Sequence, residues 1–412
     1  MRLLHTLAVP DPLPLSRSEW LEDESRIVGR MMRESLRWTG FYETLSEMAF
    51  PDGWELEGVS PSETDRGRWS DAGAYRVVRS TLQPTGDPGT YILRVRVVEL
   101  EQHDVVDLRA GDVVVRPGGR WNAVAAWVDA LVGHDTGLAG ALGTRIVATF
   151  RSAPGVKEVA LLDPIGGDPV FVTRNGSLNL TPSWGPGGTI GYMSYITGNT
   201  DWLVDGVPVS TRPGLNAAGT WSPDGRWLAL SVAEDENSEV VIVDWSTGRV
   251  HKQVTDHPAV DTSPAWSPDG KRLAFVSDRS GSPQVWVVEL DSGTLTRVTR
   301  GGYITSPTWS PLGDRLIYSQ LVGPERYVLM RHDLDTGKTR RLTAAGESDE
   351  SPCYSPDGRY VLFVRNRGDM GPGLWMMHDD GSRARPIPTG GLQAYSPDWG
   401  DPYGASTTEH PR

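Results

Sequence analysis

The chain has 412 residues and a formal net charge of −13, from 40 basic and 53 acidic side chains. This acidic balance argues against nucleic acid or an anionic membrane as the main partner, because both favour clusters of Lys and Arg. The single cysteine, Cys353, excludes an intrachain disulfide and a multi-cysteine zinc site.

The beginning of the sequence carries no recognisable export signal. Residues 1–14 have only a short apolar run, which His5 interrupts, and they lack the core and cleavage site of a signal peptide. No stretch of the chain approaches 18 apolar residues, so no transmembrane helix is expected.

The first 140 residues are predicted to form a small α/β domain. Apolar residues at helical spacing or in short β-rich runs predict helices at 20–40 and 121–132 and strands at 75–78, 91–98 and 104–115. Residues 51–70, rich in Pro, Gly, Ser and Glu, are expected to form a loop. The segment 133–143 is expected to connect this domain, residues 1–140, to a second domain, residues 141–412.

A short phrase of the type Pro-x-Trp-Ser-Pro-Asp-Gly recurs six times in the second half of the chain. The copies lie at 182–188, 219–225, 264–270, 307–313, 352–358 and, truncated, 394–398. Their aromatic residues are Trp184, Trp221, Trp266, Trp309, Tyr354 and Tyr395. These residues follow one another at intervals of 37 to 45, the length of a four-stranded propeller blade. The sequence is therefore predicted to be mainly β, with a six-bladed β-propeller after the α/β domain.

The phrase has a physical reason to recur. Pro fixes φ near −65° and Gly accepts a positive φ, so Pro-Asp-Gly favours a tight turn between two strands. The aromatic side chain before the turn is expected to fill the gap between neighbouring blades.

Both ends of the propeller are expected to share one blade. The runs at 145–150, 159–163 and 169–173 read as the second, third and fourth strands of a blade that lacks its first strand. The last copy of the phrase is expected to supply that strand, so that ring closure leaves no exposed sheet edge.

Motifs of common catalytic and metal chemistry are missing from the sequence. The eight histidines form no His-Glu-x-x-His pair, and no Gly-x-Ser-x-Gly elbow occurs. Gly337-Lys338-Thr339 lacks the preceding glycine of a phosphate loop, and Cys353 stands at a strand position where a buried, inert thiol is expected. The sequence therefore predicts no catalytic residue and no dedicated metal ligand. The acidic residues Asp261, Asp349 and Glu350, near the ring mouth, have oxygens of the kind that Ca²⁺ binds.

The chain resembles the TolB family, whose members place a small α/β domain before a six-bladed propeller. Besides the repeated phrase, the resemblance is carried by residues 36–41, 66–78 and 127–147. It implies a non-enzymatic periplasmic scaffold of the Tol–Pal envelope system, which supports outer-membrane integrity and cell division. It further implies binding of a Pal-like peptidoglycan-associated lipoprotein at the propeller mouth. No cofactor is required, although relatives allow a calcium ion in the channel.

The sequence also departs from the family pattern. The segment with which relatives bind the inner-membrane protein TolA is not found before the first strand, so contact with Pal is expected rather than contact with TolA. Other Tol-system proteins stay open as partners.

Partner contacts are expected in the loops before the innermost strands, which face the central channel. The predicted partner-binding residues are Leu215, Asn216, Ala218, Asp261, Thr262, Ser263, Thr305, Ser306, Asp349 and Glu350. Three alternatives stay open. The loops merely cap the ring, the propeller is an enzyme such as a lactonase or a peptidase fragment, or it is a sensor that binds a small ligand or ion in its channel.

Overall fold

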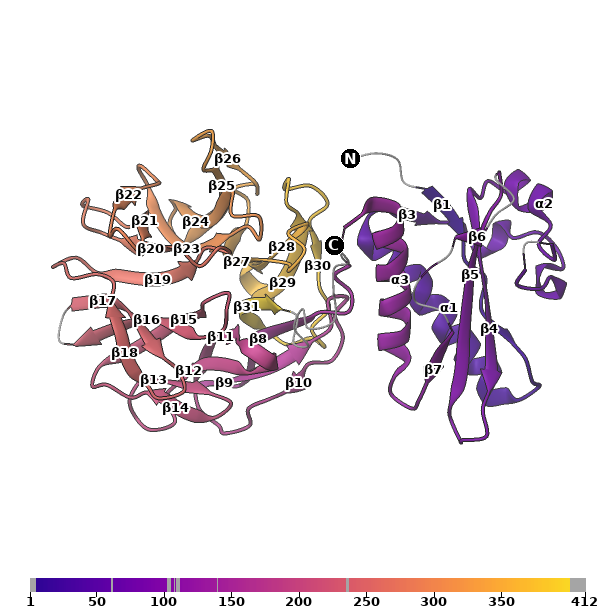
Figure 1. Ribbon diagram of the computed structural model, residues 1–412, viewed down its shortest axis with the longest axis horizontal. Helices are drawn as coiled ribbons and strands as arrows, with labels where there is room; N and C mark the ends of the chain where they lie inside the picture. Colours follow the sequence, from indigo (N-terminus) through magenta and orange to yellow (C-terminus); the bar gives the residue numbers. More distant parts are fainter. Residues whose placement is uncertain are drawn as a thin grey trace. The chain divides into compact units, whose positions relative to one another are not determined.

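The structure, a computed structural model, describes residues 5–60, 62–101, 105–106, 108, 112–138, 140–234 and 237–400. The chain divides into two units, residues 1–143 and 144–412. Figure 1 labels the elements of both. The first four residues, part of the segment tested above for a signal peptide, lie outside the described residues.

The first unit is a seven-stranded sheet with helices. Its elements are β1 (His5–Ala8), β2 (Leu13–Pro14), α1 (Glu19–Thr39), β3 (Tyr42–Thr44), η1 (Glu47–Ala49), η2 (Trp54–Leu56), α2 (Arg66–Asp71), β4 (Arg76–Pro84), β5 (Tyr91–Glu99), β6 (Val105–Val106), β7 (Val113–Val115) and α3 (Arg120–Thr136). The sheet order is β3-β1-β4-β5-β6, with β2 paired to β4 and β7 paired to β5. Helices α1 and α3 pack together along one face of this sheet (Figure 1).

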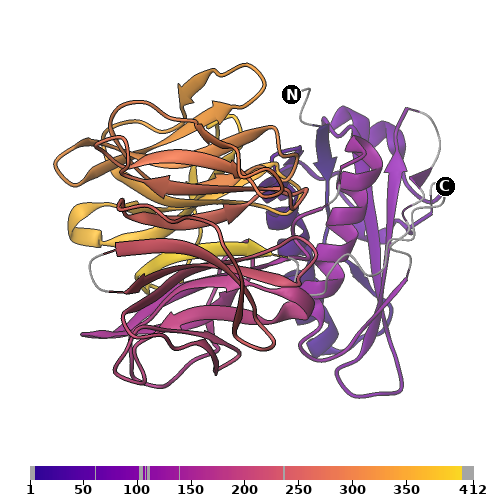
Figure 2. The same cartoon turned by 60° about the vertical axis from the view of Figure 1, so that its left-hand side comes forward.

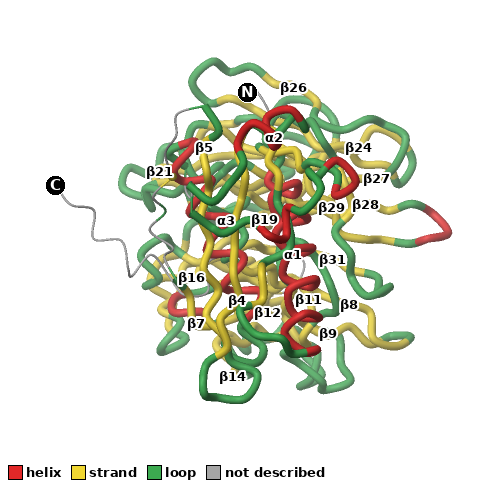
Figure 3. The backbone as a smooth tube through the Cα atoms, turned by 90° about the vertical axis from the view of Figure 1, so that its right-hand side faces the viewer, coloured by secondary structure: helices red, strands yellow, loops and turns green. Residues whose placement is uncertain are grey.

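Three details of the first unit differ from the prediction. Helix α2, short and red in Figure 3, lies inside the predicted loop, where the Asp65 carboxylate accepts the Arg68 amide and Trp69 is fully buried. Helix α3 continues into the expected connection and ends at Gly137, whose φ is 72°. The strand expected over 104–115 is replaced by the short strands β6 and β7; residues 104, 107 and 109–111 lie outside the described residues.

The second unit contains, in its described residues, six four-stranded antiparallel sheets, which confirms the predicted six-bladed propeller (Figure 2). From inner to outer strand, blade 1 is β31 (Ala394–Gly400), β8 (Arg145–Ala153), β9 (Val156–Leu162) and β10 (Val170–Phe171); blade 2 is β11 (Asn179–Trp184), β12 (Ile190–Ser194), β13 (Asp201–Val204) and β14 (Val207–Ser210); blade 3 is β15 (Leu215–Trp221), β16 (Trp227–Glu234), β17 (Asn237–Asp244) and β18 (Arg249–Gln253); blade 4 is β19 (Asp261–Trp266), β20 (Arg272–Ser277), β21 (Gln284–Glu289) and β22 (Leu295–Arg297); blade 5 is β23 (Tyr303–Trp309), β24 (Arg315–Gly323), β25 (Arg326–Asp333) and β26 (Thr339–Arg341); blade 6 is β27 (Ser348–Tyr354), β28 (Tyr360–Asn366), β29 (Pro372–His378) and β30 (Arg385–Pro386). The turns η3 (Pro186–Gly188) and η4 (Gly368–Met370) lie between strands.

The predicted closure of the ring is confirmed, but the register of the last copy is wrong. Strand β31 pairs antiparallel with β8, so the C-terminal strand completes the first blade. Trp399, not Tyr395, takes the aromatic position, because Trp399 pairs with Ile146 as Trp221 pairs with Leu228. This shift of four residues keeps each side chain on the same face of the strand but moves it to a different depth of the blade interface.

Three aromatic residues of the phrase bond to the preceding blade. The indole N–H groups of Trp184, Trp266 and Trp309 donate to the backbone carbonyls of Arg145, Thr220 and Ala265, at 3.2, 3.2 and 3.0 Å. Trp309 is buried as expected, whereas Trp266 is only half-buried. The Pro-Asp-Gly turns form as predicted, with Gly225 and Gly270 at φ 68° and 70°.

Candidate functional site

Every inner strand of the propeller is interrupted at the same place. The pairing with the second strand shifts register, and one residue other than glycine adopts a positive φ, between 43° and 53°. These residues are Thr181, Ala218, Ser263, Ser306, Ser351 and Ser396. A left-handed backbone at a residue that carries a Cβ costs about 1–3 kcal/mol. The same strained bulge therefore shapes the inner wall of all six blades.

The bulges surround a cavity of about 230 Å³ on the propeller axis, here called the central channel. Its wall consists of the bulge residue and the two residues that follow it in each blade, so Ala218, Ser263 and Ser306 line it, as predicted. Cys353 also lines it and is buried, which confirms the expected buried thiol. Burial raises the pKa of the Cys353 thiol well above its usual value, and the nearby Asp398 carboxylate raises it further.

Three of the predicted partner-binding side chains are buried and engaged within the chain. Asn216 donates to the carbonyls of Thr200 and Arg212, both at 2.8 Å. Asp261 accepts the Arg279 guanidinium at 2.6 Å, and Asp349 accepts Arg365 through two bonds of 2.6 and 2.8 Å. All three side chains are fully buried. Their hydrogen bonds and ion pairs hold the first residues of the inner strands in place, and the side chains do not face the solvent.

These ion pairs engage two of the three carboxylates considered as calcium ligands, Asp261 and Asp349. Burial raises the pKa of Asp261, and the charge of Arg279 opposes this shift. Glu350, half-buried, accepts the hydroxyl of Ser348 at 2.9 Å. Among the described residues, no group of three or more His, Cys, Asp or Glu side chains is arranged to hold a metal ion.

A cavity of about 340 Å³ opens between blades 4 and 5 where their inner strands begin, a face here called the mouth. The residues that line this mouth cavity are Val260, Thr262, Ser263, Val276, Asp278, Pro283, Tyr303, Ile304 and Thr305. Two backbone amides hold its geometry: the Val260 amide donates to the Asp278 carboxylate at 3.0 Å, and the Ile304 amide donates to the Pro283 carbonyl at 3.1 Å.

The mouth cavity contains three predicted residues and two that sequence reasoning missed. Thr262, Ser263 and Thr305 are partly exposed within it. Val260 and Tyr303 are 42% and 45% exposed, so they present apolar surface beside these small polar groups. Val260 directly precedes the predicted Asp261, and Tyr303 lies two residues before the predicted Thr305. An apolar residue beside these predicted contacts is the signal that could have identified both. Leu215 instead packs partly against the core of blade 3.

The chain is similar to known proteins in sequence and in fold. The family described as the TolB β-propeller domain matches residues 134–403. The Tol-Pal system protein TolB of Desulfosudis oleivorans is 28% identical over 260 residues, which are 61% of this chain and 58% of that relative. The TolB of Rickettsia massiliae is 31% identical over 137 residues, which are 31% of each chain. The chain thus spans less than two thirds of the length of these relatives.

A solved structure shows the same fold over nearly the full length. The crystal structure of TolB from Acinetobacter baumannii matches with a TM-score of 0.81 and 22% identity, covering 97% of each chain. Within the described residues, no helix has both the length and the apolar character required to cross a bilayer.

Proposed function

The chain belongs to the TolB β-propeller family, and on this premise we propose that it is a periplasmic, non-enzymatic scaffold of the Tol–Pal system that docks a Pal-like lipoprotein at the propeller mouth. The mouth cavity is the observation that supports the docking site. It joins exposed apolar groups, on Val260 and Tyr303, to small polar side chains that leave room for an inserted segment.

The chemistry of the mouth favours binding over catalysis. A general acid or base needs a carboxylate that is free to exchange a proton with a substrate. Asp261 and Asp349 are instead held by arginines below the surface, and Asp278, which lines the mouth cavity, accepts the Val260 amide. We assign no ion or cofactor to this function, because docking of a protein segment needs none.

The interface is expected to be of ordinary size, with a small number of dominant residues. Stable protein interfaces bury roughly 1,200–2,000 Å², and a handful of central residues carry most of the binding energy. Thr262 lies in the mouth cavity at the start of β19, so a larger charged side chain there would fill the space that a partner segment requires.

The test is calorimetric titration of the protein with the Pal-like lipoprotein encoded by the same genome. The variant Thr262→Arg should weaken binding at least about tenfold, the scale of a hot-spot residue. Thr296→Arg is the matched control, because Thr296 is an exposed threonine on the outer strand of the same blade. Equal affinity of both variants and the wild type would reject the mouth as the docking site. An absence of binding by the wild type would reject the scaffold function itself.

A further inference from the structure

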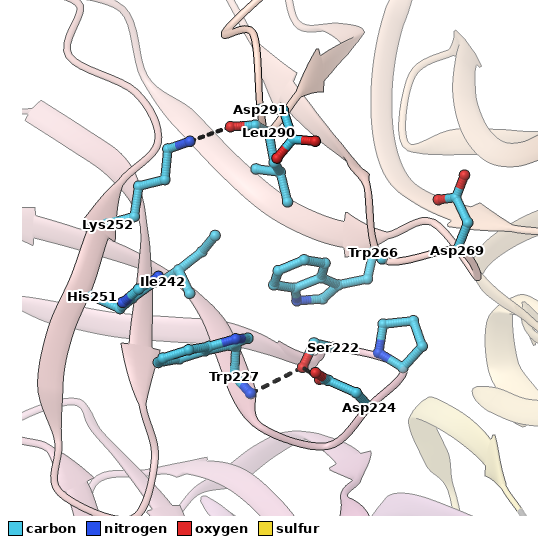
Figure 4. Close-up of a pocket in the computed structure, with 12 residues that line it drawn as sticks. Ser222, Asp224, Trp227, Ile242, His251, Lys252, Trp266, Asp269, Leu290 and Asp291 are labelled. Carbon is cyan, nitrogen blue, oxygen red and sulfur yellow. Dashed lines mark hydrogen bonds between the residues drawn. The ribbon is translucent and has the colours of Figure 1, made fainter.

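A second cavity, of about 370 Å³, lies between blades 3 and 4 at the opposite end of the inner strands, beside the Pro-Asp-Gly turns. Figure 4 shows this cavity, here called the interblade pocket. Its walls include the indole rings of Trp227 and Trp266, the aliphatic side chains of Ile242 and Leu290, and polar groups from three turns. The volume falls within the range of about 300–1,000 Å³ that is typical of ligand sites.

Both tryptophans are held in place by contacts with neighbouring groups. Trp227 stacks on His251, with ring centroids 3.9 Å apart, and Arg226 lies near the Trp227 ring as well. The Trp266 indole N–H is bonded to the carbonyl of Thr220. The two rings therefore flank the pocket in fixed positions (Figure 4).

Two other junctions of the repeat show what can fill this position. In the next blade the residue equivalent to Trp227 is Arg272, and its guanidinium lies over the Trp309 ring, 4.7 Å from the centroid. Arg272 also contacts the Asp269 carboxylate of its own turn, at 3.8 Å. In blade 6 the equivalent residue is Tyr360, which stacks on Trp399.

The junction between blades 3 and 4 lacks this internal cover. Among the described residues, no aromatic ring or cationic side chain of the chain is placed over Trp266. Trp227, which would cover it by position, is turned onto His251 instead. The indole of Trp266 is consequently left half-buried at the edge of an open pocket.

The electrostatics of the pocket favour a cation. The carboxylates of Asp224, Asp269 and Asp291 line it together with the ammonium group of Lys252, which donates to the Leu290 carbonyl. Arg272 lies 3.8 Å from Asp269, so Asp224 and Asp291 carry most of the charge that is left for a ligand. The hydroxyl of Ser222 lowers the pKa of Asp224, and that of Ser267 lowers the pKa of Asp269. Both carboxylates are therefore ionised at neutral pH.

We propose that the interblade pocket binds the guanidinium group of an arginine side chain presented by a segment of a protein partner. Arginine suits the pocket better than lysine, because its planar guanidinium stacks on an indole while its N–H groups bond to carboxylates. The contact of Arg272 with Trp309 and Asp269 is the same arrangement made within the chain. Since the pocket and the mouth lie at opposite ends of the inner strands, both can be occupied at once.

The test uses the whole protein and the probe acetyl-Gly-Arg-Gly-amide, with the same peptide containing citrulline as its neutral counterpart. Binding is followed by NMR of the indole N–H signals of Trp227 and Trp266. The arginine peptide should shift both signals saturably and should bind at least about fivefold more tightly than the citrulline peptide. Equal binding of the two peptides, or no saturable shift, would overturn the proposal. Free L-arginine that binds as tightly as the peptide would overturn the assignment to a partner segment.

Variants separate the pocket from the rest of the propeller. Trp227→Arg should place a guanidinium over Trp266, as Arg272 does over Trp309, and reduce peptide binding at least about tenfold in a folded protein. Asp291→Asn should weaken binding about two- to fivefold. Asp335→Asn, in the equivalent hairpin turn of blade 5, is the matched control and should bind normally. Unchanged binding by Trp227→Arg would overturn the proposal, whereas Thr262→Arg, at the mouth, should leave peptide binding intact.

Discussion

The buried pair of Asp349 and Arg365 offers a quantitative test of how the mouth is built. The Asp349 side chain is 0% exposed, and its two bonds to Arg365 are accompanied by stacking of the guanidinium on Trp375, 4.5 Å from the ring centroid. Removing one partner of a buried pair costs about 3–5 kcal/mol, because the remaining charge is left in a medium of low polarity. Arg365→Met should therefore lower the free energy of unfolding by about that amount.

The two partners should not cost the same. Arg365 also contacts Glu347 at 3.0 Å, so Asp349→Asn leaves the guanidinium with a second carboxylate. We expect a loss of only about 1–3 kcal/mol for Asp349→Asn, the range for an incompletely satisfied buried group. The double variant should lose less than the sum of the single variants, since it leaves no buried carboxylate without a cation.

The assay is urea-induced unfolding followed by far-UV circular dichroism, with the four proteins compared as a double-mutant cycle. Losses that are equal for both single variants, or additive in the double variant, would refute the asymmetry. If millimolar calcium stabilised the wild type but not Asp349→Asn, the ion pair itself would be refuted, because the Asp349 carboxylate would then bind an ion instead of Arg365.

Two further predictions concern ring closure and pH. Trp399→Ala should lower the free energy of unfolding by about 3–5 kcal/mol, as the loss of a large aromatic does in a packed interior. Tyr395→Ala should lower it clearly less, because Trp399 is buried and donates to Thr144, whereas Tyr395 is half-buried against the Lys157 ammonium group. Equal losses in urea unfolding would contradict the register of β31. A hydrogen bond from Arg315 lowers the pKa of Asp314 to about 2. The ionised Asp314 carboxylate therefore stabilises the folded state fully above about pH 4, and this stabilisation is lost as the pH falls through about 2. Thermal denaturation should show that Asp314→Asn reduces the loss of stability over this window, and an unchanged pH dependence would contradict the role of Asp314.

Local chemistry made most of the propeller predictable. The Pro-Asp-Gly turn depends on residues next to one another, so its copies located the strands and the blade length. The aromatic residue of the last copy was predicted wrongly, because Tyr395-Ser396-Pro397-Asp398 has the same sequence pattern as the phrase. The pairing of Trp399 with Ile146 shows the correct alignment. The short helix α2 was missed although Asp65 is a typical N-cap residue.

The site was predictable in place but less so in detail. Thr262, Ser263 and Thr305 line the mouth cavity, as expected of short polar residues that precede the innermost part of each blade. Asp261 and Asp349 do not, since each is neutralised by an arginine 16 to 18 positions further along the chain, a pairing that no local pattern shows. The interblade pocket was also out of reach, because it depends on the direction in which Trp227 turns.

The pairing of β31 with β8 has a consequence for biosynthesis. Arg145 and Gly400 are partners in this ladder, and a ribosome adds about 5–20 residues per second. The edge of β8 must therefore wait on the order of tens of seconds for its neighbour to be synthesised. Contacts of such high sequence separation form slowly, and unpaired strand edges are prone to association with other chains. We expect the nascent propeller to depend on chaperones until its final strand is available, and a chain released before β31 to be a substrate for proteases.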